Sequence, residues 1–180
     1  MRVIAGSAKG TRLGPVPLGT RPLSDRAREG LFSSLGHGVV GAKVLDLFAG
    51  TGALGIEALS RGAAEAMFVD SSPGAVGAIK ANLERTKLGE RATVLRSRWE
   101  DVLRRRPRAY DLAFLDPPYD RSDQEVSAVL SALERGWIAS RFTVAVTRAR
   151  KGYSDGISVN WQVAKRLEYG DTLIVLYREV

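Results

Sequence analysis

The stretch that most constrains the fold runs from Asp46 to Gly55 and reads DLFAGTGALG. A short apolar run, 43–45, precedes it, and the alanine- and leucine-rich residues 53–60 follow. This order predicts a buried strand, a tight glycine loop and a helix. The glycines at 50, 52 and 55 have the spacing of the dinucleotide fingerprint, which permits a sharp turn and a close approach of backbone to ligand. The loop is therefore predicted to hold a nucleotide-like molecule.

Asp46 indicates the kind of nucleotide. An acid at the mouth of the loop is a poor neighbour for a pyrophosphate, because two anions would share a confined site. A ligand with an adenosine, a positive charge and no phosphate suits the position better, and S-adenosylmethionine has a sulfonium, an ammonium and a ribose diol. Asp70, which ends a second apolar run (66–69), falls near the position of a ribose-binding acid. The sequence therefore predicts S-adenosylmethionine as the ligand.

Strands and helices alternate from residue 43 onward. The predicted strands are near 43–48, 65–70, 91–96, 110–116 and 142–147, and the predicted helices are near 53–61, 73–86, 99–106 and 123–135. The tail is predicted to form two further strands, 157–167 and 172–177, joined by a tight turn. This alternation indicates an α/β fold, a mostly parallel sheet with helices on both faces, to which the tail strands are added antiparallel at one edge.

The residues before the glycine loop follow a different pattern. Residues 2–5 and 11–13 are predicted to be two short strands joined by a polar turn. A helix capped by Ser24 or Asp25 is expected to run to about residue 35. We therefore expect a small hairpin and a helix ahead of the sheet.

Length and composition set the broad class. The chain has 180 residues, enough for one well-buried domain, which we expect over residues 21–180 with the hairpin as an extension over residues 1–20. It has no cysteine, which excludes disulfides, thiolate metal sites and a thiol nucleophile, and its one histidine, His37, lies in a predicted loop. The sequence has neither an apolar run that could cross a bilayer nor the pattern of a signal peptide. A cytoplasmic, metal-free protein without membrane contact is expected.

The charge distribution favours an anionic partner. The formal net charge is +7, and basic residues gather in three clusters, at 2–28, 96–108 and 141–151. A single cluster of this kind is usually just a solvated surface. Three clusters with few acids to offset them favour a nucleic acid or another polyanion.

The second stretch that indicates chemistry is 116–119, Asp-Pro-Pro-Tyr, which ends the apolar run 110–115. Ligands bind at the carboxyl ends of strands in open α/β sheets, so this acid, Asp46 and Asp70 are expected to face one crevice. An aspartate, a carbonyl held rigid by the prolines and an aromatic ring would together bind a flat group that bears an amine. Such contacts would aim the nitrogen lone pair at a methyl donor. The alternative, a Pro-Pro that merely ends a strand, is disfavoured by the flanking acid and aromatic residue and by the glycine loop upstream.

The two motifs together resemble the amino-group methyltransferases that use S-adenosylmethionine, and more closely the RsmD-like family of bacterial 16S ribosomal RNA guanine-N2 methyltransferases. The resemblance covers nearly the whole chain. It rests on four blocks, namely RVIAG with Lys9-Gly10, Arg21-Pro22 through Phe32, Asp46 through Ala63, and Tyr169-Gly170-Asp171-Thr172. It implies a Rossmann-like class I methyltransferase fold, with a seven-stranded sheet, an antiparallel C-terminal strand and a small N-terminal β-hairpin.

The resemblance also implies roles for individual residues. Those expected to bind the cofactor are Asp46, Phe48, Gly50, Gly52, Asp70, Arg98, Trp99 and Asp116. Those expected to hold the target base and its amine are Asp116, Pro117, Pro118 and Tyr119. Those expected to bind RNA are Lys9, Arg12, Arg21 and Arg26. The implied substrate is 16S rRNA, on a small ribosomal subunit or an assembly intermediate, the implied by-product is S-adenosylhomocysteine, and a monomer is expected.

Three positions depart from the family pattern. Leu23-Ser24 stands where many members have Thr-Thr, and Thr147 stands where an acid is common. After the third strand, where an Asp or Asn often meets the adenine, this chain has Ser97-Arg98-Trp99. A tryptophan that opens a helix is more often part of the core than a cover for adenine. These departures concern adenine recognition and the substrate rim, and the predicted reaction is unchanged.

Other functions share parts of this sequence pattern. A DNA amino-methyltransferase would use the same tetrapeptide on adenine or cytosine, although 180 residues leave no visible target-recognition domain. A nucleotide-dependent oxidoreductase would share the glycine loop, but Asp46 and the 116–119 motif argue against it. A non-catalytic RNA-binding assembly factor could keep the cofactor fold, and salt-sensitive RNA binding without turnover would favour it.

Overall fold

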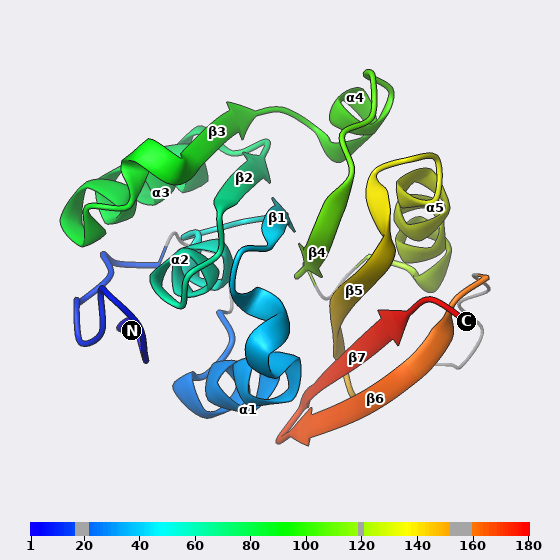
Figure 1. The fold of residues 1–180 in the computed structure, drawn as a ribbon, viewed down its shortest axis with the longest axis horizontal. Helices are drawn as coiled ribbons and strands as arrows, with labels where there is room; N and C mark the ends of the chain where they lie inside the picture. The colour runs from blue at the N-terminus through cyan, green and yellow to red at the C-terminus, as the bar shows by residue number, and fades with distance from the viewer. Residues whose placement is uncertain (17–21, 119–120, 152–159) are drawn as a thin grey trace.

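A computed structural model describes residues 1–16, 22–118, 121–151 and 160–180 (Figure 1). These residues contain a seven-stranded sheet with the order β3-β2-β1-β4-β5-β7-β6. The strands are β1 (Lys43–Leu47), β2 (Glu65–Asp70), β3 (Ala92–Arg96), β4 (Tyr110–Leu115), β5 (Ile138–Ala149), β6 (Gln162–Tyr169) and β7 (Thr172–Arg178). Neighbouring strands from β3 to β5 are parallel, whereas β7 is antiparallel to both β5 and β6. The predicted α/β fold is confirmed.

Helices cover both faces of the sheet (Figure 1). They are α1 (Asp25–Leu35), α2 (Ala53–Ser60), α3 (Pro73–Thr86), α4 (Trp99–Leu103) and α5 (Asp123–Leu133), with short 3-10 helices η1 (Gly36–Val39) and η2 (Gly89–Arg91). One core cluster contains residues of α1, α2 and α3 such as Leu31 and Ile56, and the other contains residues of α4 and α5 such as Leu130. Val44 and Leu45, adjacent in β1, enter opposite clusters because side chains alternate along a strand. Within the described ranges, no helix is long and apolar enough to cross a membrane.

The carboxyl ends of six strands lie along one edge of the sheet, which we call the catalytic edge. Strand β6 runs in the same direction as β1 to β5, because β6 and β5 are each antiparallel to β7. At the centre of the sheet, β1 lies between β2 and β4, and Leu47 pairs with Leu115. The strand order reverses between β1 and β4, and a crevice that binds ligand forms at such a switch point. The residues that follow β1 and β4 are therefore placed side by side at this crevice.

The helix ahead of the sheet begins and ends for identifiable reasons. The Ser24 side chain accepts a hydrogen bond from the Ala27 N–H at 3.1 Å, as the capping prediction required. Leu31 and Phe32 are buried against the sheet. The chain leaves α1 at Gly36, whose φ of 54° suits a glycine, and continues into η1 rather than the irregular loop that was predicted around His37.

Three predicted boundaries are corrected by the structure. Helix α4 ends at Leu103 instead of 106, because the helical conformation is disfavoured for the residue before Pro107. Strand β5 begins at Ile138, four residues before the predicted start at 142. Strand β6 begins at Gln162, and the predicted strand residues 157–159 lie outside the described part of the chain.

The predicted N-terminal strands do not form a ladder. The described segment has one isolated antiparallel bridge, between Arg2 and Arg12. The backbone N–H groups of Ile4 and Ala5 donate instead to the carboxylate of Glu57 on α2, at 2.8 and 3.0 Å. The segment is therefore a narrow hairpin held by a helix, and a strand pattern in the sequence could not reveal this distant partner.

Candidate active site

The glycine loop connects β1 to α2 at the catalytic edge. Asp46, near the end of β1, is 1% exposed, and its Oδ2 accepts a hydrogen bond from the Gly55 N–H at 2.9 Å. Gly52 has a φ of 76° and immediately precedes α2, so the turn requires a residue that tolerates left-handed backbone. The loop is thus tied to the strand by the same carboxylate that the sequence analysis singled out.

Gly55 allows α2 to lie close to β2. A Cβ at this position would be 2.3 Å from Cε1 of Phe68 and 3.1 Å from Oδ2 of Asp46. We expect Gly55→Ala to lower the free energy of unfolding by about 1–3 kcal/mol through overpacking, and to weaken cofactor binding by displacing Asp46. Urea unfolding and calorimetric titration with S-adenosylmethionine would measure both effects.

Gly77→Ala on α3 is the matched control for this substitution. A Cβ there would meet no other atom within 4 Å, so alanine is expected to be neutral or stabilising. Equal stability of the two alanine variants would contradict the close packing assigned to Gly55.

Asp70, at the end of β2, holds the glycine loop from the other side. Its Oδ2 accepts a hydrogen bond from the Gly50 N–H at 2.9 Å, and its Oδ1 accepts one from the Ser72 N–H at 2.9 Å. Each carboxylate oxygen can accept a further hydrogen bond, so the group can still accept hydrogen bonds from hydroxyl groups of a ligand. The sequence predicted that Asp70 binds the ribose. The structure adds its hydrogen bond to Gly50, which holds the glycine loop in place.

Asp116 directly follows β4 and faces Asp46 across the switch point. Burial raises its pKa to about 7, and a hydrogen bond from the Thr147 side chain partly opposes that increase. Burial also raises the pKa of Asp46, with the Gly55 N–H acting in the opposite direction and the nearby Asp116 and Asp70 adding to the increase. Carboxylates gathered in this way favour a cationic ligand, because a positive charge would restore their ionised forms.

The two prolines that follow Asp116 differ in exposure. Pro117 is buried and Pro118 is exposed, and the Pro118 carbonyl accepts a hydrogen bond from the Arg121 N–H at 3.1 Å. Tyr119, the predicted stacking residue, lies outside the described residues. The described part of the motif therefore places an acid and proline carbonyls at the end of β4.

Aromatic residues flank the crevice on the side of α4. The Arg121 guanidinium lies 5.4 Å from the centre of the Phe48 ring. Trp99 begins α4 and packs against the second core cluster, which agrees with its interpretation as a core residue. Among the described residues, Trp99 Nε1 and Glu100 Oε2 are buried without hydrogen-bond partners. An adenine, which has hydrogen-bond donors and acceptors at its edges, could satisfy both atoms.

The predicted basic residues are not gathered at this crevice. Arg98 is exposed and pairs with Glu100 at 2.7 Å. Lys9 and Arg12 are exposed in the N-terminal segment, and Arg21 lies outside the described residues. Arg26 is exposed in the first turn of α1, where it lines a hollow of about 330 Å³ with Ser24, Glu168, Tyr169 and Gly170. Among the described residues of this set, none forms a hydrogen bond or ion pair with Asp46, Asp70 or Asp116.

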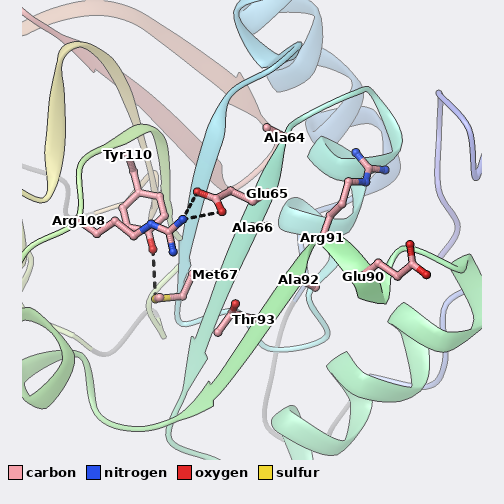
Figure 2. Close-up of a pocket in the computed structure, with 10 residues that line it drawn as sticks. All are labelled: Ala64, Glu65, Ala66, Met67, Glu90, Arg91, Ala92, Thr93, Arg108 and Tyr110. Carbon is pink, nitrogen blue, oxygen red and sulfur yellow. Dashed lines mark hydrogen bonds and ion pairs between the residues drawn. The ribbon is translucent and has the colours of Figure 1, made fainter.

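A separate pocket lies at the opposite edge of the sheet (Figure 2). Its volume is about 200 Å³, and it is lined by residues at the starts of three strands, Glu65 of β2, Ala92 of β3 and Tyr110 of β4. Figure 2 shows the Arg108 guanidinium paired with the Glu65 carboxylate, at 2.6 and 2.7 Å. The Tyr110 hydroxyl donates to Sδ of Met67 at 3.4 Å. This pocket is remote from the switch point and takes no part in the candidate site.

Comparison with known proteins identifies the family. The family described as "Conserved hypothetical protein 95" matches residues 1–178. The chain belongs to this family. Ribosomal RNA small subunit methyltransferase D of Escherichia coli (strain K12) is 34% identical over 180 residues, which are 99% of this chain and 89% of that protein. YlbH of Bacillus subtilis (strain 168) is 41% identical over 138 residues, 74% of each chain.

A solved structure supports the same grouping. The E. coli methyltransferase yhhF superposes with a TM-score of 0.87 at 34% identity, covering 99% of this chain and 97% of that one. The RsmD-like resemblance seen in the sequence is therefore confirmed, as is the class of fold.

No contacts were assigned from the sequence to three buried polar residues. Thr147 had been noted only as a departure from the family pattern, and neither Arg148 nor Glu57 had been given a role. Their partners are distant in the sequence, 27 residues from Arg148 to the Arg121 carbonyl and 53 from Glu57 to the Ile4 N–H. For Arg148 and Glu57, the one signal in the sequence was a charged side chain within or beside an apolar strand or helix.

Proposed function

We propose that the protein transfers a methyl group from S-adenosylmethionine to the exocyclic N2 of a guanine in 16S rRNA, on a small ribosomal subunit or an assembly intermediate. The observation that carries this proposal is the position of Asp116 and the prolines at the end of β4, beside the glycine loop. An acceptor for an amine and a site for a cationic nucleoside thus meet at the switch point. The family's rRNA methyltransferases support the same reaction class.

The cofactor site uses residues from three strand ends. Asp46, Gly50 and Gly52 surround the methionine end, where buried carboxylates favour the sulfonium and ammonium. Asp70 binds the ribose hydroxyls with the lone pairs that Gly50 and Ser72 leave free. Phe48, Arg98 and Trp99 border the adenine, and Trp99 Nε1 supplies an unused donor in the described part of the chain. The by-product, S-adenosylhomocysteine, has lost the sulfonium charge and is held less tightly by these acids.

The target amine is held by the loop after β4. The cofactor, when bound, supplies an electrophilic methyl group. The Asp116 carboxylate and the Pro117 carbonyl accept the two amine hydrogens, Pro118 keeps the turn rigid, and Tyr119 stacks on the guanine. This arrangement directs the nitrogen lone pair toward the methyl group, and the proton released from nitrogen passes to Asp116 or to water. Orientation provides most of the acceleration, since the base must be extruded from its stack to enter the site.

The surrounding basic residues bind the RNA. Lys9 and Arg12 of the extension 1–20, together with Arg21 and Arg26 before and in α1, contact phosphates around the extruded base. The domain 21–180 is small, so we assign part of the recognition surface to the folded RNA and proteins of the subunit. The enzyme acts as a monomer in the cytoplasm.

Tritiated methyl transfer tests the substrate. Small subunits, naked 16S rRNA and duplex DNA from a host that lacks this enzyme are compared side by side at equal nucleotide concentration. Label in the subunits or the RNA is the expected result, and their ratio identifies the form that is used. Label in DNA alone would assign the chain to DNA methylation, and cofactor binding without transfer to any substrate would favour a non-catalytic assembly factor.

The raised pKa of Asp116 predicts the pH dependence. The ionised carboxylate is a stronger acceptor for the amine hydrogens than the protonated group and can take up the released proton, so kcat/KM for the cofactor is expected to rise with pH and to have a midpoint near the pKa of about 7. Stability should change in the opposite direction. The folded pKa lies above the ordinary value of 3.8, so the stabilising contribution of protonated Asp116 is fully present below that value and is lost as pH rises through about 7.

The two measurements are a pH–rate profile and urea unfolding at a series of pH values. Asp116→Asn should remove this contribution from the unfolding curve while the other groups still titrate. A rate profile with its midpoint below about pH 5 would contradict the assignment of Asp116 as an acceptor with a raised pKa.

A further inference from the structure

Two consecutive residues at the end of β5 contact the two ends of the catalytic loop, residues 116–123. Leu115 of β4 pairs with Val146 of β5, so the next residues, Asp116 and Thr147, are also neighbours. Successive side chains of a strand point to opposite faces. Thr147 therefore lies on the face of Asp116, and Arg148 lies on the face covered by α5.

Thr147 contacts the carboxylate itself. It is 2% exposed, and its side chain is hydrogen-bonded to Asp116. Because an ionised carboxylate can only accept, the Thr147 hydroxyl must be the donor in that state. This bond leaves the other lone pairs of Asp116 for the amine and restricts the rotation of the carboxylate. Asp46 on β1 is a titratable neighbour of the same group.

Arg148 contacts the downstream end of the loop. Its side chain is 9% exposed, and its Nη2 donates to the Arg121 carbonyl at 2.8 Å and to Asp123 Oδ1 at 2.9 Å. Asp123 is the first residue of α5, so one guanidinium joins the loop, the helix and β5. Burying a charge in this way is costly unless it is paired, and here the ion pair is with Asp123 of α5, while the loop supplies the Arg121 carbonyl as a second acceptor.

The loop is also held from the side of the glycine loop. The Arg121 guanidinium lies over the Phe48 ring, and its Nη1 donates to Glu125 at 3.1 Å. Arg121 is therefore fixed at its backbone by Arg148 and at its side chain by Phe48 and α5. The loop that contains the tetrapeptide is connected to the cofactor loop through this residue.

We propose that Thr147 and Arg148 are positioning residues for the reaction: Thr147 orients the Asp116 carboxylate, and Arg148 fixes the far end of the loop that carries it. This inference rests on the proposed function for its kinetic consequences. The positions of the Asp116 carboxylate and of the loop do not depend on the reaction, so both can be measured without turnover.

The test uses conservative pairs of variants with controls on the same strand. Thr147→Val removes the hydroxyl and Thr147→Ser keeps it, while Arg148→Met removes the charge and Arg148→Lys keeps it. Thr143→Val and Arg141→Met, which lie earlier in β5, serve as controls. For each protein we would measure melting temperature, cofactor dissociation constant, and kcat and KM at saturating cofactor.

Thr147→Val is expected to lower kcat about tenfold and to move the midpoint of the pH–rate profile upward, with Thr147→Ser restoring both. Arg148→Met is expected to lower kcat about 10–100-fold with the cofactor dissociation constant within a factor of about two, and Arg148→Lys to recover part of the loss. A fall in kcat that simply follows melting temperature, or an equal fall in the controls, would overturn the proposal.

Two readouts separate this proposal from the proposed function. Carbon-13 NMR of labelled aspartate carboxyls should show a higher pKa for Asp116 in Thr147→Val, and hydrogen exchange should be faster at the Arg121 amide in Arg148→Met. Both changes are expected even if the wild-type protein methylates none of the substrates offered. If both are absent, the positioning roles are wrong whatever the activity.

Discussion

Replacement of Asp116 by asparagine is expected to lower kcat about 10³-fold while the cofactor still binds. Asparagine keeps the shape of the side chain but presents an amide in place of the carboxylate, so one acceptor for the target amine is weakened or replaced by a donor. The Thr147 hydrogen bond holds the carboxylate in place at the end of β4. Single-turnover methyl transfer and calorimetric titration would measure the two effects separately.

Asp111→Asn is the matched control for this prediction. Asp111 lies on the same strand, β4, at the opposite edge, where its Oδ2 accepts a hydrogen bond from the Lys43 N–H at 2.8 Å. The Asp111→Asn substitution should leave kcat unchanged. If Asp116→Asn abolished cofactor binding as thoroughly as turnover, Asp116 would be a structural residue and the assignment of the amine site would be wrong.

Replacement of Glu57 by alanine is expected to destabilise the protein by about 3–5 kcal/mol, the largest loss of stability among these variants. Glu57 is fully buried, and its oxygens accept hydrogen bonds from the Ile4 and Ala5 N–H groups and from Arg61 Nε at 2.7 Å. Arg28, also fully buried, lies 3.9 Å from it. Its removal leaves the two backbone N–H groups without their acceptor and takes away a carboxylate beside the buried Arg28, whose hydrogen bonds to the Arg2 carbonyl and to Asp25 remain. It also releases the N-terminal segment from α2.

Urea unfolding and limited proteolysis of the N-terminal segment are the measurements for Glu57. Glu57→Gln should lose less stability than Glu57→Ala because glutamine retains an acceptor. Glu84→Gln, on the exposed face of α3, should lose almost no stability. A loss below about 1 kcal/mol for Glu57→Ala would contradict the role given to this carboxylate.

The motifs in the sequence predicted the parts of the fold that are determined locally. The glycine loop, the strand before it and the Pro-Pro turn depend on neighbours in the chain, and their positions agree with the structure. Ser24 could be identified as a cap because it precedes an apolar helical pattern. The common direction of the strands then placed Asp46, Asp70 and Asp116 at one edge without further information.

The parts that could not be predicted depend on contacts between distant residues. A buried Glu57 within an apolar helix has no sequence signature that names Ile4 and Ala5 as its partners. The same applies to Arg148, whose partners are in the loop after the neighbouring strand. The position of β7 between β5 and β6 was also open, since a hairpin can be added to an edge by either of its strands.

Mass spectrometry of nucleosides tests the central claim most directly. Small subunits from a host that lacks this enzyme are incubated with trideuteromethyl-labelled S-adenosylmethionine and either the wild-type protein or Asp116→Asn, and the 16S rRNA is digested to nucleosides. We predict labelled N2-methylguanosine with the wild-type protein and almost none with the variant. Label in methyladenosine or methylcytidine instead, or equal N2-methylguanosine from both proteins, would contradict the account.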